Sequence, residues 1–172
     1  LLTAGLTTNN YMPAIATGRL AAKNDAEVRA YLNKVIEYEQ AQKKPEEWQK
    51  TVLHFGGGSD SYEQNKLANF LQQYKAIIED TLWGGKVYTF LKKTTQPFEF
   101  NLSDSLKNLI NNGVSMMTFF AHAAGVGFDM STDNPSEYNN RGKYFFILAN
   151  SCFAGDIFGN VGINSYGTTR SS

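Results

Sequence analysis

A cysteine and a histidine stand at matching points of this sequence. Cys152, the single cysteine, follows the apolar run Tyr144 to Ala149, and His122, one of two histidines, follows the run Val114 to Phe120. If these runs are neighbouring parallel strands, both side chains emerge at the carboxyl edge of one sheet, where open α/β folds bind ligands. A free thiol, with a pKa of about 8.5, attacks only as the thiolate, and a histidine with a pKa of about 6.5 can take its proton. The first hypothesis is therefore a Cys/His protease site.

The competing interpretation of the same two residues is structural. A free cysteine behaves as a small hydrophobe, and Cys152 stands beside Phe153 below an apolar strand, so it could serve packing alone. Catalysis would also require hydrogen-bond donors for the oxyanion, and the backbone N–H groups of Ala123 and Cys152 follow the same two strands. Small residues near both strand ends would let a peptide approach: Ala123, Ala124, Gly125, Ala154 and Gly155.

Composition limits the class of protein. The chain has 172 residues, the length of one domain, and 42% of them are hydrophobic, enough to bury a core. Sixteen basic and sixteen acidic residues cancel, so neither nucleic acid nor an anionic membrane is expected as a partner. One cysteine excludes an internal disulfide and a multi-thiolate zinc site, and no cofactor or metal is predicted. No apolar run approaches the roughly 18 residues of a membrane span, and the first residues lack a signal-peptide pattern.

The periodicity of apolar residues predicts alternating strands and helices. Helices are expected over 25–39, from about 60 to 78 and over 103–112, and strands over 51–55, 86–91, 114–120 and 144–149. This alternation predicts a mostly parallel sheet with helices on both faces, in one α/β domain that includes residues 1–172. The second helix is expected to bury Leu67, Phe70, Leu71, Tyr74, Ile77 and Ile78, and the strands to bury Phe119, Phe120, Phe145 and Phe146. The segment 121–143 has no such periodicity, which favours a functional loop.

The order of several motifs resembles one peptidase family. The motifs are Ile15-Ala16-Thr17-Gly18-Arg19-Leu20, Ile36-Glu37-Tyr38-Glu39, Trp48, Ala121-His122-Ala123 and Asn150-Ser151-Cys152-Phe153-Ala154-Gly155-Asp156. Between about Pro13 and Phe158 the chain is similar to gingipain-type cysteine peptidases of family C25. The resemblance implies a caspase-like three-layer sandwich, His122 as general base, Cys152 as nucleophile and a peptide or protein substrate. It also implies secretion or residence at a bacterial cell surface.

The chain differs from the pattern of that family at two places and matches it at a third. The family has glycine on both sides of its histidine, where this chain has Ala121 and Ala123, and this difference bears on the oxyanion hole. In that family an acidic residue near the end of the strand 51–55 would orient the histidine, but this chain has Gly56 there, so the third member of the site is expected to be absent. Asp60 aligns with the carboxylate that receives arginine in the arginine-specific members, where it would form a bidentate pair.

Asp60 has a second interpretation, because it precedes a predicted helix. Ser59, Asp60 and Ser61 are all favoured N-cap residues, and Ser61 with Gln64 would form a capping box. Family resemblance also implies that a peptidase region continues beyond the cysteine. The start at Leu1 without methionine and the glycine-containing tail indicate an excerpt, so the remaining parts of a longer chain are expected partners.

Three alternatives remain open on the sequence. The two alanines and the unassigned acid would suit an inactive relative that serves as an interaction or secretion-associated module. Gly56-Gly57-Gly58 before a helix could hold a phosphate at the helix N-terminus, as in a nucleotide-binding domain, although no Gly-Lys-Ser/Thr ending follows. Asp129, Asp133 and Glu137 could offer oxygen ligands to calcium, although their spacing lacks the glycine of an EF-hand loop.

Overall fold

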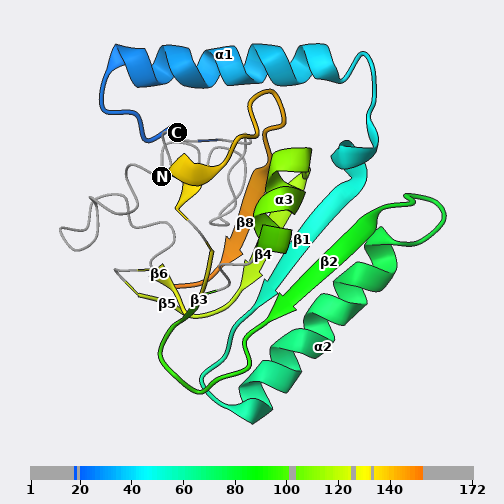
Figure 1. Ribbon diagram of the computed structural model, residues 1–172, viewed down its shortest axis with the longest axis vertical. Helices are drawn as coiled ribbons and strands as arrows, with labels where there is room; N and C mark the ends of the chain where they lie inside the picture. Colours follow the sequence, from blue (N-terminus) through cyan, green and yellow to red (C-terminus); the bar gives the residue numbers. More distant parts are fainter. Residues whose placement is uncertain (1–17, 19, 101–103, 125–126, 133, 153–172) are drawn as a thin grey trace, which may run out of the picture.

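The central feature of the protein is a parallel sheet. The computed structural model describes residues 18, 20–100, 104–124, 127–132 and 134–152. Within them, four strands pair in the order β2-β1-β4-β8, and each pair is parallel (Figure 1). Their bounds are Thr51–Gly56 for β1, Lys86–Leu91 for β2, Met116–Phe120 for β4 and Phe146–Asn150 for β8. The predicted parallel sheet is confirmed.

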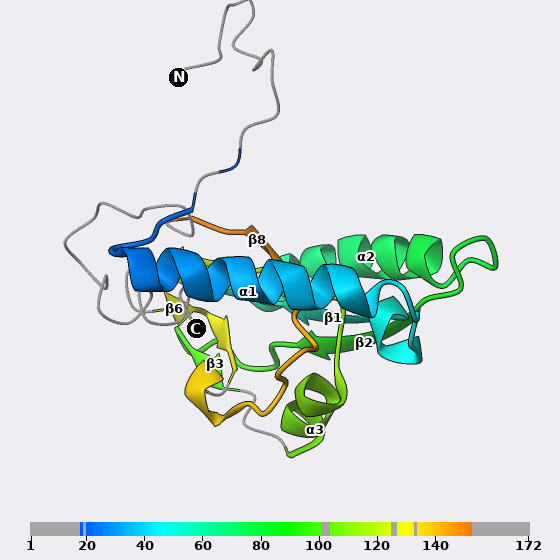
Figure 2. The ribbon, with the colours of Figure 1, turned by 90° about the horizontal axis from the view of Figure 1, so that it is seen from above.

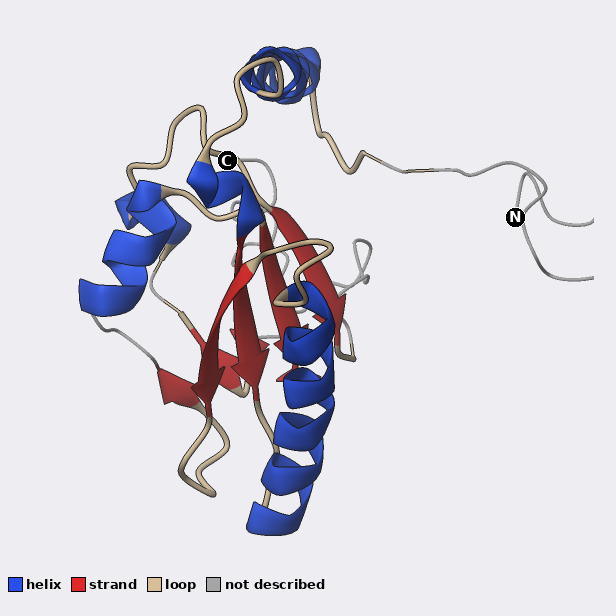
Figure 3. Ribbon diagram, turned by 90° about the vertical axis from the view of Figure 1, so that its right-hand side faces the viewer, coloured by secondary structure: helices blue, strands red, loops and turns tan. Residues whose placement is uncertain are grey.

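Helices cover both faces of this sheet. Helix α2 (Ser61–Ile78) connects β1 to β2 and packs on one face, and α3 (Asp104–Asn112) precedes β4 and lies on the other (Figures 2 and 3). Helix α1 (Asp25–Ala41) crosses beyond the amino ends of the strands, far from their carboxyl edge (Figure 1). The arrangement has the α/β character of the sandwich that the sequence predicts.

The face of the sheet toward α3 holds the core. Strand residues alternate between the two faces, so Leu53 and Phe55 of β1 point the same way as Phe119 of β4. The rings of Phe55 and Phe119 stack with their centroids 4.5 Å apart. The same cluster includes Leu106 and Ile110 of α3, which are fully buried, as predicted for the inner face of that helix.

Short elements occupy the segment in which the sequence shows no periodicity. Strands β5 (Ala123–Ala124) and β6 (Gly127–Phe128) form an antiparallel pair, and β7 (Met130–Ser131) pairs with β3 (Glu99–Phe100). Among the described residues, the 3-10 turn η2 (Pro135–Glu137) also lies in this segment, whereas η1 (Glu47–Lys50) precedes β1. Strands of two residues are too short to leave an alternating pattern, which explains why the sequence predicts a plain loop.

Several predicted buried residues are instead exposed. On α2 only Leu71 is fully buried, whereas Phe70, Tyr74 and Ile77 are 36%, 44% and 70% exposed. Phe146 is 65% exposed because β8 lies at the edge of the described sheet. The apolar positions of α1 are exposed as well: Val28, Tyr31, Leu32 and Ile36. An apolar stripe shows which side of an element favours burial, but a second element must cover it.

None of the described helices has the length and apolar composition needed to cross a bilayer.

Candidate active site

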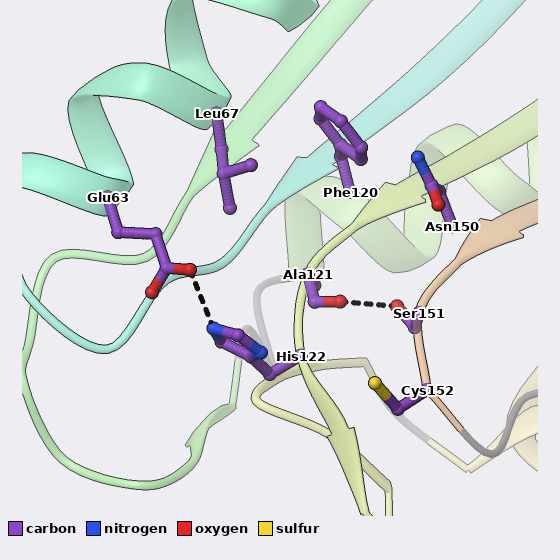
Figure 4. A pocket seen from close by; sticks show the side chains of 8 residues that line it. All are labelled: Glu63, Leu67, Phe120, Ala121, His122, Asn150, Ser151 and Cys152. Carbon is purple, nitrogen blue, oxygen red and sulfur yellow. Dashed lines mark hydrogen bonds and ion pairs between the residues drawn. The ribbon is translucent and has the colours of Figure 1, made fainter.

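His122 and Cys152 extend from two neighbouring strands at the same level. Strands β4 and β8 are parallel, and Phe120 lies opposite Asn150 in their register. His122 follows Phe120 by two residues and Cys152 follows Asn150 by two, so the register carries both side chains to the same edge. The predicted neighbouring strands are confirmed, and Figure 4 shows the two side chains at one hollow.

This hollow has a volume of about 340 Å³ and opens at the carboxyl edge of the sheet. It lies between the first turns of α2 and the ends of β4 and β8 (Figure 4). The Ser151 hydroxyl donates a hydrogen bond to the Ala121 carbonyl, which joins the two strand extensions. The thiol of Cys152 is free and exposed. The residues that line the hollow are Glu63, Leu67, Phe120, Ala121, His122, Asn150, Ser151 and Cys152.

A carboxylate from α2 holds the histidine ring. Nε2 of His122 lies 2.8 Å from Oε1 of Glu63. The other oxygen, Oε2, accepts from the Ser59 backbone N–H at 2.8 Å and from the Ser59 hydroxyl at 2.7 Å. The hydrogen bonds from Ser59, the backbone one foremost, and then the contact with His122 lower the pKa of Glu63 from its ordinary 4.5 to about 2. Glu63 is therefore ionised at neutral pH.

The ionised Glu63 also assigns the proton on the imidazole. A carboxylate without its proton only accepts hydrogen bonds, so Nε2 of His122 must carry the hydrogen. In the neutral ring Nδ1 then holds the free lone pair, and the ring stands between Glu63 and Cys152 (Figure 4). The family pattern would place an acid that orients the histidine at the end of β1, where this chain has Gly56, and here the acid comes instead from α2. The only sequence signal was Glu63 three residues after Asp60, a spacing that indicates a helix start.

Comparisons with known proteins identify the family of this chain. The sequence model of peptidase family C25 matches residues 3–169, nearly the whole chain. This chain belongs to peptidase family C25. The predicted family is thereby confirmed. A solved structure described as "Structure of Protease" has the same fold, with a TM-score of 0.60 and 23% sequence identity. The match covers 85% of this chain and 31% of the other, so this chain spans about a third of that protein. No curated protein matches the sequence.

In this C25-family chain, Asp60 caps α2. Its Oδ1 accepts the backbone N–H of Glu63 at 2.8 Å. The N-cap is therefore Asp60 itself, and the predicted box of Ser61 with Gln64 is wrong, because Ser61 already lies inside the helix. The Gln64 amide donates instead to the carbonyls of Gly58 and Thr94. Asp60 is not among the residues that line the hollow.

In the glycine loop of the C25 chain, the backbone N–H groups of Gly57 and Gly58 donate hydrogen bonds to other groups of the same chain. The N–H of Gly57 donates to the Phe120 carbonyl at 3.1 Å, and that of Gly58 donates to Oδ2 of Asp129 at 2.9 Å. A Cβ on Gly57 would lie only 2.1 Å from Oδ1 of Asp129, so the close approach requires glycine. These two amides bind groups of the chain itself rather than a phosphate.

Asp129 also ties together the loops that follow three strands. Its Oδ2 lies 3.3 Å from Nζ of Lys92, after β2, and both side chains are buried. Its backbone N–H donates to the His122 carbonyl at 2.9 Å. Since hydrogen-bonded and non-bonded pairs alternate in an antiparallel ladder, the next residue, Ala123, directs its N–H away from β6.

The predicted oxygen ligands for calcium are engaged elsewhere where the structure describes them. Asp129 pairs with Lys92, and Glu137 lies 3.0 Å from Lys107. Asp133 lies outside the described residues. Among the described residues, no three acidic, histidine or cysteine side chains gather as a metal site would require.

Proposed function

We propose that this chain carries the catalytic residues of a cysteine endopeptidase, with Cys152 as nucleophile, His122 as general base and Glu63 as the group that orients His122. The observation that carries the proposal is the 2.8 Å contact between Nε2 of His122 and Glu63. It leaves Nδ1 as the basic nitrogen of a histidine whose strand neighbours the one that leads to Cys152. Family membership supports a peptide or protein substrate.

The proposed reaction begins with transfer of the thiol proton of Cys152 to Nδ1 of His122. The thiolate attacks the carbonyl carbon of the scissile peptide bond, and the negative charge on the oxygen is stabilised by the backbone N–H groups of Ala123 and Cys152. The imidazolium returns its proton to the departing amine, which leaves a thioester on Cys152. Water, deprotonated by His122, then hydrolyses the thioester and releases the carboxylic acid product.

Glu63 contributes by position and charge. It fixes the ring so that Nδ1 is the proton acceptor, and it stabilises the positive charge that develops on His122. One of the two observations that favoured an inactive module was the lack of an acidic residue near Gly56. In this proposal Glu63 of α2 supplies the acid, so that observation no longer favours inactivity. From the family resemblance we further propose that the full protein is secreted or held at a cell surface.

The test is the rate at which iodoacetamide alkylates Cys152 at pH 7. We expect His122→Ala to slow alkylation at least about tenfold, and Glu63→Gln to slow it severalfold, because the base is removed in one variant and disoriented in the other. Cleavage of a casein substrate should fall in parallel, by the roughly hundredfold or more typical of general base loss.

A matched control for Glu63→Gln exists in the same chain. Glu27 stands three residues after the N-cap Asn24, as Glu63 does after Asp60, but it contacts no histidine. Glu27→Gln should leave both rates unchanged. An alkylation rate that stays the same in His122→Ala would rule out the proposed dyad.

A further inference from the structure

We propose that the hollow beside His122 and Cys152 receives an apolar side chain, so that the enzyme cleaves after large apolar residues such as Phe, Leu or Met. This inference rests on the proposed peptidase function and adds its substrate class. Leu67 and Phe120 are the residues that determine the preference, and they are the large apolar residues of the lining.

Leu67 is placed by the helix that also supplies Glu63. The two residues are four positions apart on α2, so their side chains lie on the same helix face one turn apart. Figure 4 shows Leu67 directed from α2 toward the hollow, beside the Glu63–His122 contact. An apolar wall therefore stands next to the catalytic base.

Phe120 forms the second apolar wall. It is the last residue of β4, two positions before His122, and it lines the hollow together with that histidine. Its ring meets Phe70 edge to face, with centroids 5.8 Å apart, and lies 6.5 Å from the ring of Tyr74. These contacts with α2 hold the Phe120 ring in place, so the wall is preformed.

Among its described residues, the hollow offers no free carboxylate for a bidentate pair with a basic substrate side chain. The carboxylate among the lining residues is Glu63, and each of its oxygens already accepts a hydrogen bond, from His122 or from Ser59. Asp60, the residue that aligned with an arginine-binding carboxylate, accepts the N–H of Glu63 outside the lining. A guanidinium placed against Leu67 and Phe120 would lose water without gaining a bidentate pair, because Oε2 of Glu63 already accepts two hydrogen bonds from Ser59.

The test uses the intact protein and a series of fluorogenic peptides that differ only in the residue before the scissile bond. With Phe, Leu, Arg and Asp at that position, kcat/KM for Phe and Leu should exceed kcat/KM for Arg by at least about tenfold, the scale on which apolar pockets discriminate. A preference for Arg would overturn the inference and leave the peptidase proposal standing. Failure to cleave any peptide, together with Cys152 alkylation that does not depend on His122, would overturn both.

Two variants locate the preference. Leu67→Asp introduces a carboxylate into the hollow and should raise the ratio of Arg to Phe cleavage at least about tenfold. Ile77→Asp places the same charge on α2 at a position that is 70% exposed and outside the lining, and it should leave the ratio unchanged.

A third variant decides the case in which Leu67→Asp does not fold. Phe120→Leu keeps the wall apolar but shortens it, so kcat/KM for Phe should rise severalfold relative to Leu. Circular dichroism confirms folding of each variant. If folded Phe120→Leu leaves the ratio of Phe to Leu cleavage unchanged, Phe120 does not contact the substrate and the inference fails.

Discussion

At the scale of single residues, Glu63 couples the start of α2 to His122. Its pKa of about 2 in the folded protein lies below the ordinary 4.5 because Ser59 and His122 bind the carboxylate. The unfolded chain takes up this proton near pH 4.5 and the folded protein does so only near pH 2. The stabilisation by the carboxylate is therefore complete above about pH 4.5 and is lost as the pH falls toward 2.

This linkage predicts how the effect of Glu63→Gln depends on pH. The difference in Tm between the wild type and Glu63→Gln should be larger at pH 6 than at pH 3, because the wild type alone loses the bonds of an ionised carboxylate on acidification. Thermal unfolding followed by circular dichroism at both values measures it. A difference that is the same at both values would mean that Glu63 titrates alike in the folded and unfolded chain.

At the scale of elements, the buried pair of Lys92 and Asp129 fixes the loops that present His122. Lys92 follows β2, Asp129 follows β6, and the side chains of the pair are 1% and 8% exposed. Asp129 also accepts the N–H of Gly58 and donates its own N–H to His122. One carboxylate thus links the loop after β1 to the hairpin of β5 and β6.

Removal of the lysine should destabilise the fold strongly. Lys92→Met leaves Asp129 charged and without its ion pair, and breaking a buried pair in this way costs about 3–5 kcal/mol. Adding Asp129→Asn removes the buried charge and should restore part of the loss. The free energy of unfolding in urea checks both values. A loss below about 1 kcal/mol in Lys92→Met would show that the pair contributes little.

At the scale of the whole molecule, the described chain exposes an apolar edge. The outer edge of β8 pairs with no described strand, and Phe146, Ile147 and Leu148 are 65%, 50% and 49% exposed. Exposed strand edges with apolar side chains favour association. The 31% coverage of the related solved chain means that a protein of this fold can be much longer than these residues.

The exposed edge predicts how these 172 residues behave when produced alone. Light scattering coupled to size-exclusion chromatography should show association that increases with concentration. Ile147→Lys should reduce it, because a lysine on an edge strand opposes pairing. Ile77→Lys, at a position on α2 that is also exposed, is the control and should not reduce it. A wild-type chain that stays monomeric at about 100 µM would contradict this expectation.

Sequence patterns predicted the elements better than their burial. The helix 25–39 and the strands 51–55 and 86–91 match the observed α1, β1 and β2 to within two residues at each end. Burial of Leu106 and Ile110 was predicted correctly, but Phe146 and Ile77 are exposed. Periodicity depends on neighbouring residues along one element, whereas burial depends on the element that packs against it.

The sequence by itself determined the alternation of strands and helices and the two strand ends that carry His122 and Cys152, because these features depend on local spacing. Only the tertiary structure decided that Glu63 holds His122, since the two residues are 59 positions apart and nothing in the intervening chain relates them. Only the tertiary structure, likewise, decided that Asp129 pairs with Lys92 and that Leu67 and Phe120 line one hollow. The pairing of the strands and the packing of α2 on the sheet bring side chains together that are distant in the sequence.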